Sequence, residues 1–239
     1  MLFNVIKDIL LTAKSNRQPG LEVASADLLD EKSEGLQLRK VLNVGGNSKA
    51  IAIPPYYDGW DHLLLDVDHR GEPDIICDSR KLVELAPRQF DAIYCSHNLE
   101  HYLKHDVTKV LAGFHHVLLA DGFVDIRVPD MGALMREVVA KGLDIEDFLY
   151  QSPAGPILVS DVIYGWGREI EESGNDFFAH KTGFTEKSLV ARLHASGFGT
   201  VFSAASNLEV QAIGFKSEPP EFAIKLLGLE SLLVSIEER

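Results

Sequence analysis

The chain has 239 residues, of which 46% are hydrophobic and 25% charged, the balance of a globular protein that can bury a core. Its formal net charge is -13, and a surface that negative repels nucleic-acid phosphates and anionic lipid. No apolar run approaches the roughly 20 residues that a membrane span requires. We therefore expect a cytoplasmic protein with one main domain and neither nucleic-acid nor membrane partners.

Two segments flank the expected domain. Residues 1–37 begin with an amphipathic apolar stretch over 1–11 and are predicted to form a helical extension. In residues 217–239, Pro219-Pro220 precedes an amphipathic pattern over 222–233, which predicts a C-terminal helix. Packing onto the domain is the commoner role of such helices, and a homodimer contact is the alternative.

Four short apolar runs predict strands that are buried on both faces of a parallel sheet. They cover residues 40–44, 62–67, 74–77 and 90–95. The two cysteines, Cys77 and Cys95, lie in these runs. We expect them to be small buried side chains rather than a disulfide or a metal pair.

An amphipathic helix is predicted after the fourth strand, where apolar residues recur at spacings of three and four over 107–118. Asp121-Gly122 is expected to end this helix before a strand over 123–128. The alternation of strands and helices predicts βαβ units and a doubly wound α/β fold. Ligands of such folds bind at the carboxyl ends of the strands.

Residues 131–178 are less regular, with one helical piece over 134–139. Three glycines around a charged run predict a solvated loop over 165–175, which we expect to move over a substrate. The aromatic residues of this region either line an apolar substrate pocket or pack the segment onto the domain. A capping box at Thr185-Glu186-Lys187-Ser188 predicts a helix that ends at Gly197, followed by strands over 200–203 and 208–215.

Glycines and polar residues stand at four successive predicted strand ends, the edge where a doubly wound sheet binds its ligand. Gly45 permits a close approach of the backbone to a ligand. Asp66 follows it by about 20 residues, the offset at which an acid accepts hydrogen bonds from both hydroxyls of a ribose. Asp68 is the alternative acid, and Asp78-Ser79 is placed to contact an adenine amine. The candidate cofactor-binding residues are Gly45, Gly46, Asn47, Asp66, Val67, Asp78, Ser79, Ser96 and His97.

These segments resemble the successive motifs of class I S-adenosylmethionine-dependent methyltransferases, closest to the small-molecule branch with a methyltransferase type 11-like domain. The matching segments are VLNVGG at 41–46, LDVD at 65–68, DIICD at 74–78, FDAIYCSHNLEH at 90–101 and LLADGF at 118–123. The resemblance covers roughly residues 38–216, and the LEH block is its most specific part. In the family's first loop an acid opens a G-x-G-x-G spacing. Here Asn43 replaces the acid, Asn47 and Lys49 replace later glycines, and Pro54-Pro55 interrupts the helix expected next.

The resemblance implies a seven-stranded, mostly parallel sheet with helices on both faces and a lid-like insertion over 131–182. It also implies S-adenosylmethionine as cofactor and in-line transfer of its methyl group to a small-molecule acceptor. His97 and His180 are the candidate catalytic residues, since histidine titrates near neutral pH, whereas a structural role is expected for His101. No metal site is expected, because the adjacent His115-His116 would point apart on a helix.

Two other functions stay open. One is a non-catalytic S-adenosylmethionine-binding or regulatory protein, which the altered glycine loop suggests. The other is an NAD-binding oxidoreductase, which a glycine turn with an acid at the second strand also suits, although G-x-G-x-x-G is absent.

Overall fold

The computed structural model describes residues 38–153 and 155–230. The predicted extension over 1–37 and the last nine residues lie outside the described residues. Among the described residues, no helix has the length and apolar character to cross a membrane.

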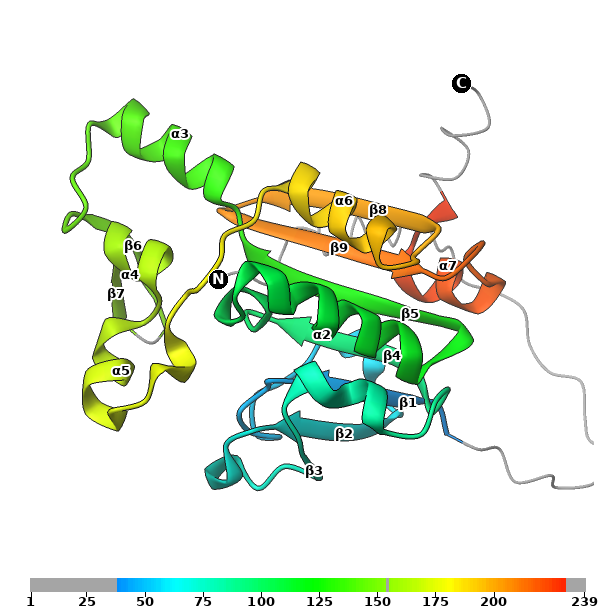
Figure 1. Cartoon of the computed structure of the whole chain (residues 1–239). Helices are drawn as coiled ribbons and strands as arrows, with labels where there is room; N and C mark the ends of the chain where they lie inside the picture. Colours follow the sequence, from blue (N-terminus) through cyan, green and yellow to red (C-terminus); the bar gives the residue numbers. More distant parts are fainter. Residues whose placement is uncertain (1–37, 154, 231–239) are drawn as a thin grey trace, which may run out of the picture.

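A seven-stranded sheet forms the centre of the structure, in the order β3-β2-β1-β4-β5-β9-β8 (Figure 1). The first five strands along the chain are parallel, whereas β9 is antiparallel to both β5 and β8. This confirms the predicted doubly wound, mostly parallel fold. The strands are β1 (Lys40–Val44), β2 (Asp61–Asp66), β3 (Ile75–Ile76), β4 (Phe90–Ser96), β5 (Leu118–Pro129), β8 (Thr200–Ser206) and β9 (Glu209–Phe215).

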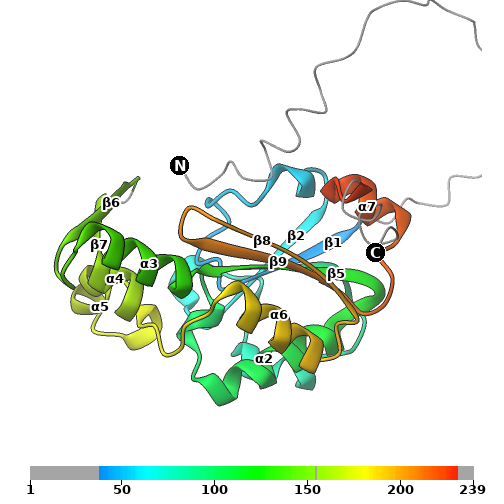
Figure 2. The same cartoon turned by 90° about the horizontal axis from the view of Figure 1, so that it is seen from above.

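Helices cover both faces of the sheet, and Figure 2 shows them on opposite sides of it. One face packs against η3 (Ser79–Glu84), α2 (Lys104–Val117) and α6 (Glu186–Ala195). The other packs against η1 (Pro55–Tyr57) and α7 (Glu221–Leu227). The 3-10 turn η1 stands where Pro54-Pro55 was expected to interrupt a helix. Short 3-10 turns also follow β2 and β4, as η2 (His69–Gly71) and η4 (Leu99–His101).

The helix α6 begins as its capping box predicts. The Thr185 side chain accepts a hydrogen bond from the Ser188 backbone N–H, and the Ser188 hydroxyl accepts one from the Thr185 N–H at 2.9 Å. Two backbone donors at the start of the helix are thereby satisfied. The helix turns Leu189 and Leu193 into the core, where both are fully buried.

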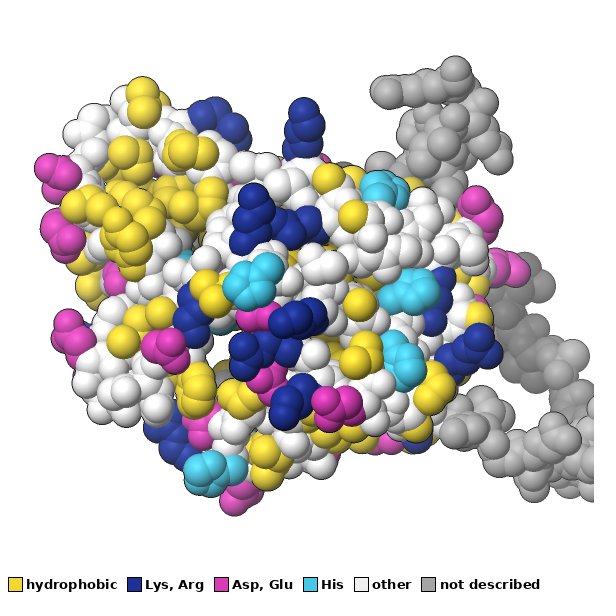
Figure 3. Space-filling model, in the orientation of Figure 1, with side chains coloured by type: hydrophobic (Ala, Val, Ile, Leu, Met, Phe, Trp, Pro, Cys, Tyr) yellow, Lys and Arg dark blue, Asp and Glu magenta, His cyan; other side chains and the backbone are white. Residues whose placement is uncertain are grey.

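The segment from 131 to 182 forms a small unit beside the carboxyl ends of the strands (Figure 1). It contains α3 (Met131–Lys141), the antiparallel pair β6 (Phe148–Ser152) and β7 (Gly155–Leu158), α4 (Val159–Tyr164), α5 (Gly167–Ser173) and η5 (Asp176–Phe178). Its own small core contains Leu134, Leu149, Val159 and Val162. Hydrophobic side chains also gather on the surface of this segment (Figure 3). Val139 of α3 is 82% exposed.

Backbone hydrogen bonds anchor this insertion at both ends. At its start, the Met131 N–H donates to the Phe184 carbonyl oxygen at 2.8 Å. At its end, the N–H groups of Lys181 and Thr182 both donate to the carbonyl oxygen of Glu100, at 2.8 and 3.1 Å. The returning chain is thus fastened to η4 at the end of β4.

The expectation of a loop over 165–175 is wrong, because residues 167–173 form the helix α5. The charged run between the glycines contains arginine and glutamate, which are good helix formers. Gly165 and Gly174 lie just outside the helix with φ of 97° and 65°. Gly165 is a close-packing position rather than a free hinge, since a Cβ there would lie 1.9 Å from the Phe178 carbonyl oxygen.

Three smaller predictions also need correction. The strand β5 begins at Leu118, so Asp121-Gly122 lies inside a strand; a Cβ at Gly122 would lie 2.7 Å from the Asp91 carbonyl oxygen on β4, which explains the glycine. The helix α7 ends at Leu227 because Gly228 adopts a left-handed φ of 65°. Cys77 follows β3 and is half-buried, whereas Cys95 is buried in β4, and both thiols are free.

Candidate functional site

A pocket of about 790 Å³ lies at the carboxyl ends of β1, β2 and β4, between the sheet and the insertion. Figure 3 shows a hollow where these two parts meet. Six of the nine candidate cofactor-binding residues line this pocket, namely Gly45, Asn47, Asp66, Val67, Asp78 and His97. Gly46, Ser79 and Ser96 are not part of its lining.

The loop after β1 passes tightly over two asparagine side chains. Gly45 adopts a left-handed φ of 71°, and a Cβ on it would lie 2.0 Å from Nδ2 of Asn98. A Cβ on Gly46 would lie 2.2 Å from Nδ2 of Asn43, which is 3% exposed beneath the loop. Asn47 takes a left-handed φ of 58°, which asparagine tolerates better than most residues. The turn therefore forms although the later glycines of the family motif are absent.

The carboxylate of Asp66 holds the first two loops together and stays available to a ligand. Its Oδ2 accepts the Asn47 N–H at 3.1 Å and its Oδ1 accepts the Asp68 N–H at 2.9 Å. Each oxygen therefore keeps one lone pair for a further donor. Asp68 is engaged elsewhere, because Arg70 donates to it through Nε at 2.8 Å and Nη2 at 2.5 Å. These hydrogen bonds lower the pKa of Asp68.

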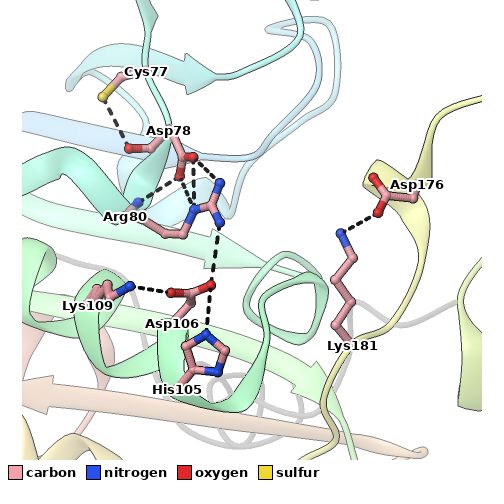
Figure 4. Close-up of polar contacts among 8 residues, drawn as sticks. All are labelled: Cys77, Asp78, Arg80, His105, Asp106, Lys109, Asp176 and Lys181. Atoms are coloured by element: carbon pink, nitrogen blue, oxygen red, sulfur yellow. Dashed lines mark hydrogen bonds and ion pairs between the residues drawn. The ribbon is translucent and has the colours of Figure 1, made fainter.

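At the third strand end, Asp78 pairs with an arginine that the sequence analysis did not single out (Figure 4). Arg80 donates to Asp78 through Nε at 2.9 Å and Nη2 at 2.5 Å, and its Nη1 lies 3.4 Å from Asp106. Hydrogen bonds from Arg80 hold the pKa of Asp78 below its usual range. Ser79 is 2% exposed and is not among the residues that line the pocket.

At the fourth strand end, His97 lies between two carboxylates. Its Nε2 is 2.9 Å from Oε2 of Glu209, and its Nδ1 is 3.5 Å from Oε1 of Glu100. Partial desolvation of the ring disfavours its charged form, but the carboxylates of Glu209 and Glu100 outweigh this effect and raise the pKa of His97 to about 10. At neutral pH the ring is therefore an imidazolium, which has no free lone pair to accept a proton.

This arrangement makes the stabilising effect of His97 depend on pH. We expect the protonated ring to stabilise the fold fully below its unfolded pKa of about 6.5, and to lose this effect as the pH rises through about 10. His97→Asn keeps a residue that tolerates the left-handed φ of 49°. The variant should therefore lower the free energy of unfolding more at pH 6 than at pH 10.5, as measured by urea denaturation. Equal losses at both pH values would contradict the assigned ion pairs.

The other candidate catalytic residue, His180, lies behind the wall of the pocket. Its side chain is 13% exposed, and its Nδ1 donates to the Val162 carbonyl oxygen at 2.9 Å. Burial lowers the pKa of His180, so its ring is neutral near pH 7. His101, for which a structural role was expected, lines the pocket and also places its ring nitrogens 3.1 Å from two backbone carbonyl oxygens.

No protein-family model matches the sequence, and no curated protein matches it significantly. Similar solved structures include an S-adenosylmethionine-dependent methyltransferase from Archaeoglobus fulgidus, at 13% identity and a TM-score of 0.47 over 74% of this chain and 86% of that one. A methyltransferase of the same kind from Methanosarcina mazei has 14% identity and a TM-score of 0.47, over 76% of this chain and 94% of that one. Burkholderia thailandensis 1,6-didemethyltoxoflavin-N1-methyltransferase, solved with its substrate and S-adenosylhomocysteine, has 17% identity and a TM-score of 0.44, over 76% and 72%.

These similarities concern the fold, which the order and directions of the seven strands already define. The chain has a doubly wound α/β fold whose seven-stranded sheet is parallel except for β9, which runs antiparallel to both of its neighbours. The described pocket lies at the carboxyl ends of the strands, the edge at which doubly wound sheets bind their ligands.

The pocket fits S-adenosylmethionine on three observations and departs on one. Its volume lies within the range of small-molecule sites, the glycine turn at Gly45 lies in its lining, and Asp66 keeps free lone pairs. Val67 and Leu103 present half-exposed apolar surface beside Asp78. The departure is Asp78, whose carboxylate is shared with Arg80, so an adenine amine would meet an ion pair rather than a free acid.

Several pocket residues were missed by the sequence analysis, chiefly Arg80, Asn98, Tyr102, Asp106 and Lys181. Asn98 and Tyr102 lie within or next to the LEH block, so their position was a usable signal. Asp106 and Lys181 carry none, because only the packing of α2 and the insertion brings them to the pocket.

Proposed function

We propose that the chain transfers a methyl group from S-adenosylmethionine to a small-molecule acceptor. The observation that carries the proposal is the convergence of Gly45, Asp66 and Asp78, from three successive strand ends, on one pocket of about 790 Å³. Polar residues at separate strand ends need not share a pocket. Here they do, at the edge where doubly wound sheets bind nucleotides.

In this proposal the loops after β1, β2 and β3 hold the cofactor. Asp66 accepts hydrogen bonds from the ribose hydroxyls through its remaining lone pairs. The backbone from Gly45 to Asn47 lies against the aminoacyl part. Val67 and Leu103, 40% and 47% exposed, provide apolar surface for the adenine.

The insertion provides the acceptor side of the pocket. Phe177 and Phe178 line it together with His101 and Lys181, and Lys181 pairs with Asp176 at 3.0 Å (Figure 4). Two aromatic rings beside a cation suit an acceptor with an apolar body and a polar or anionic group. The net charge of -13 disfavours nucleic acid as that acceptor.

S-adenosylmethionine supplies an electrophilic methyl group whose transfer releases a neutral thioether. The protein's part is to align the acceptor and to exclude water. His97 is held as an imidazolium, so its role here is to balance the charges of Glu100 and Glu209 rather than to accept the acceptor's proton. His180 reaches the acceptor only if the pocket wall rearranges, and its catalytic assignment stays a prediction.

Calorimetry followed by a turnover assay tests this proposal. We expect S-adenosylmethionine and S-adenosylhomocysteine to bind with one site per chain, NAD not to bind, and S-adenosylhomocysteine to accumulate with at least one member of an acceptor panel of aromatic and apolar hydroxy and amino compounds. Binding without turnover would favour the non-catalytic alternative. Absence of S-adenosylmethionine binding at millimolar concentration would refute the proposal.

A further inference from the structure

Glu100, on η4, is a buried charge that the methyl-transfer proposal does not use. It is 1% exposed, and among the described residues neither of its carboxylate oxygens accepts a hydrogen bond. The nearby ring nitrogens stay at ion-pair distance from Oε1, Nδ1 of His97 at 3.5 Å and Nε2 of His180 at 3.9 Å. His97 also shares its charge with Glu209. A buried carboxylate without close donors is unfavourable, so a further cation would stabilise it.

The ring of His180 beside Glu100 is oriented like that of a metal-binding histidine. The Nδ1–H of His180 donates to the Val162 carbonyl oxygen, so its Nε2 presents a lone pair on the side of Glu100. Metal-binding histidines commonly make this kind of backbone hydrogen bond through the other ring nitrogen.

The ring of His101 has a donor conflict that a cation would remove. Its Nδ1 lies 3.1 Å from the Ala179 carbonyl oxygen, and its Nε2 lies 3.1 Å from the His97 carbonyl oxygen. Carbonyl oxygens only accept, and a neutral imidazole carries one proton. One nitrogen of neutral His101 therefore points a lone pair at an oxygen, an arrangement that becomes favourable when both atoms face a cation.

The ligand atoms of Glu100, His101 and His180 all lie within 4.8 Å of one another. Two imidazoles and one carboxylate form the ligand set of many Zn²⁺ and Fe²⁺ sites, with positions left open for another ligand. We propose that Glu100, His101 and His180 bind one divalent transition-metal ion at the edge of the pocket. The expectation of no metal site rested partly on the absence of an H-x-x-x-H spacing and overlooked that His97 and His101 form one. His180 joins them only through the fold.

The place of this site suggests what the ion would do. His101 lines the pocket, whereas Glu100 and His180 are not part of its lining, so an ion held by these three residues would lie at the edge of the pocket. An acceptor oxygen or nitrogen bound there would lose its proton more easily. Metal binding itself goes beyond the proposed methyl transfer and is measured without S-adenosylmethionine, so either proposal can fail alone.

The test uses the full chain without an affinity tag, stripped with a chelator and titrated with Zn²⁺ by calorimetry and with Co²⁺ by visible absorption. We expect one equivalent of either ion to bind. Glu100→Gln and His180→Gln should each weaken Zn²⁺ binding by at least about 100-fold. As the matched control, His105→Gln should bind Zn²⁺ like the wild type, because this histidine is 71% exposed and lies near Asp106, outside the cluster.

Two results would overturn the proposal. One is no Zn²⁺ binding by the folded wild type, and the other is undiminished binding by both folded variants. X-ray absorption of the Zn²⁺-loaded wild type decides the matter if either variant fails to fold. A first shell containing two imidazoles supports the proposal, and one with fewer than two refutes it.

Discussion

Gly45→Val is expected to abolish measurable S-adenosylmethionine binding. A β-branched residue is strongly disfavoured at the left-handed φ of 71°, and a Cβ would lie 2.0 Å from Nδ2 and 2.3 Å from Cγ of Asn98. Since Asn98 lines the pocket, the displaced side chain would enter the space proposed for the cofactor. Strain of this kind costs on the order of 1–3 kcal/mol. Calorimetry measures the binding, and urea denaturation measures the stability.

Gly142→Val is the matched control. Gly142 ends α3 with a similar φ of 64°, but a Cβ there would meet nothing within 4 Å. The control should therefore lose stability through backbone strain alone and keep wild-type cofactor affinity. If Gly45→Val does not fold, the milder Gly45→Ala takes its place. Wild-type affinity in a folded Gly45 variant would show that the loop after β1 does not bind the cofactor.

Asp66→Ala is expected to weaken S-adenosylmethionine binding by about 1.5–3 kcal/mol, which is roughly 10- to 150-fold in the dissociation constant. The variant removes the acceptor of the ribose hydroxyls. It also removes the acceptor of the Asn47 and Asp68 N–H groups, which now fix the loops on either side. Calorimetry with S-adenosylmethionine gives the change directly.

Asp68→Ala separates the two acids. Its carboxylate is held by Arg70, so this change should cost little affinity while freeing the Arg70 side chain. The opposite pattern, in which Asp68→Ala weakens binding and Asp66→Ala does not, would show that Asp68 and not Asp66 contacts the ribose.

The fold was largely predictable because its signals are local. Buried parallel strands read as short apolar runs, and the predicted strand over 40–44 matches β1 residue for residue. The capping box at Thr185 is also a local pattern, and it correctly predicted the start of α6. Errors arose where packing overrode local preference. Gly122 resembled a helix stop, yet it serves the close contact of β5 with β4.

Only those features of the site that lie within a single strand end could be predicted from the sequence. Asp66 ends β2 and was identified from its offset to Gly45, and the geometry favours it over Asp68. Asp78 pairs with Arg80 over two residues at the start of η3, whereas the burial of Ser79 depends on packing between separate elements. His180 reaches Glu100 only through the return path of the insertion, which no local pattern reveals.

The anchoring of the insertion at Glu100 has a mechanical consequence. Because Lys181 and Thr182 share one carbonyl oxygen on η4, the insertion cannot swing outward as a free flap without pulling on the residue whose side chain faces His97 and His180. A bulky acceptor that pushes the insertion outward would therefore also displace Glu100 relative to His97 and His180. Hydrogen exchange at the amides of Lys181 and Thr182 measures this movement, because these protons exchange with solvent only when their hydrogen bonds to the Glu100 carbonyl oxygen open.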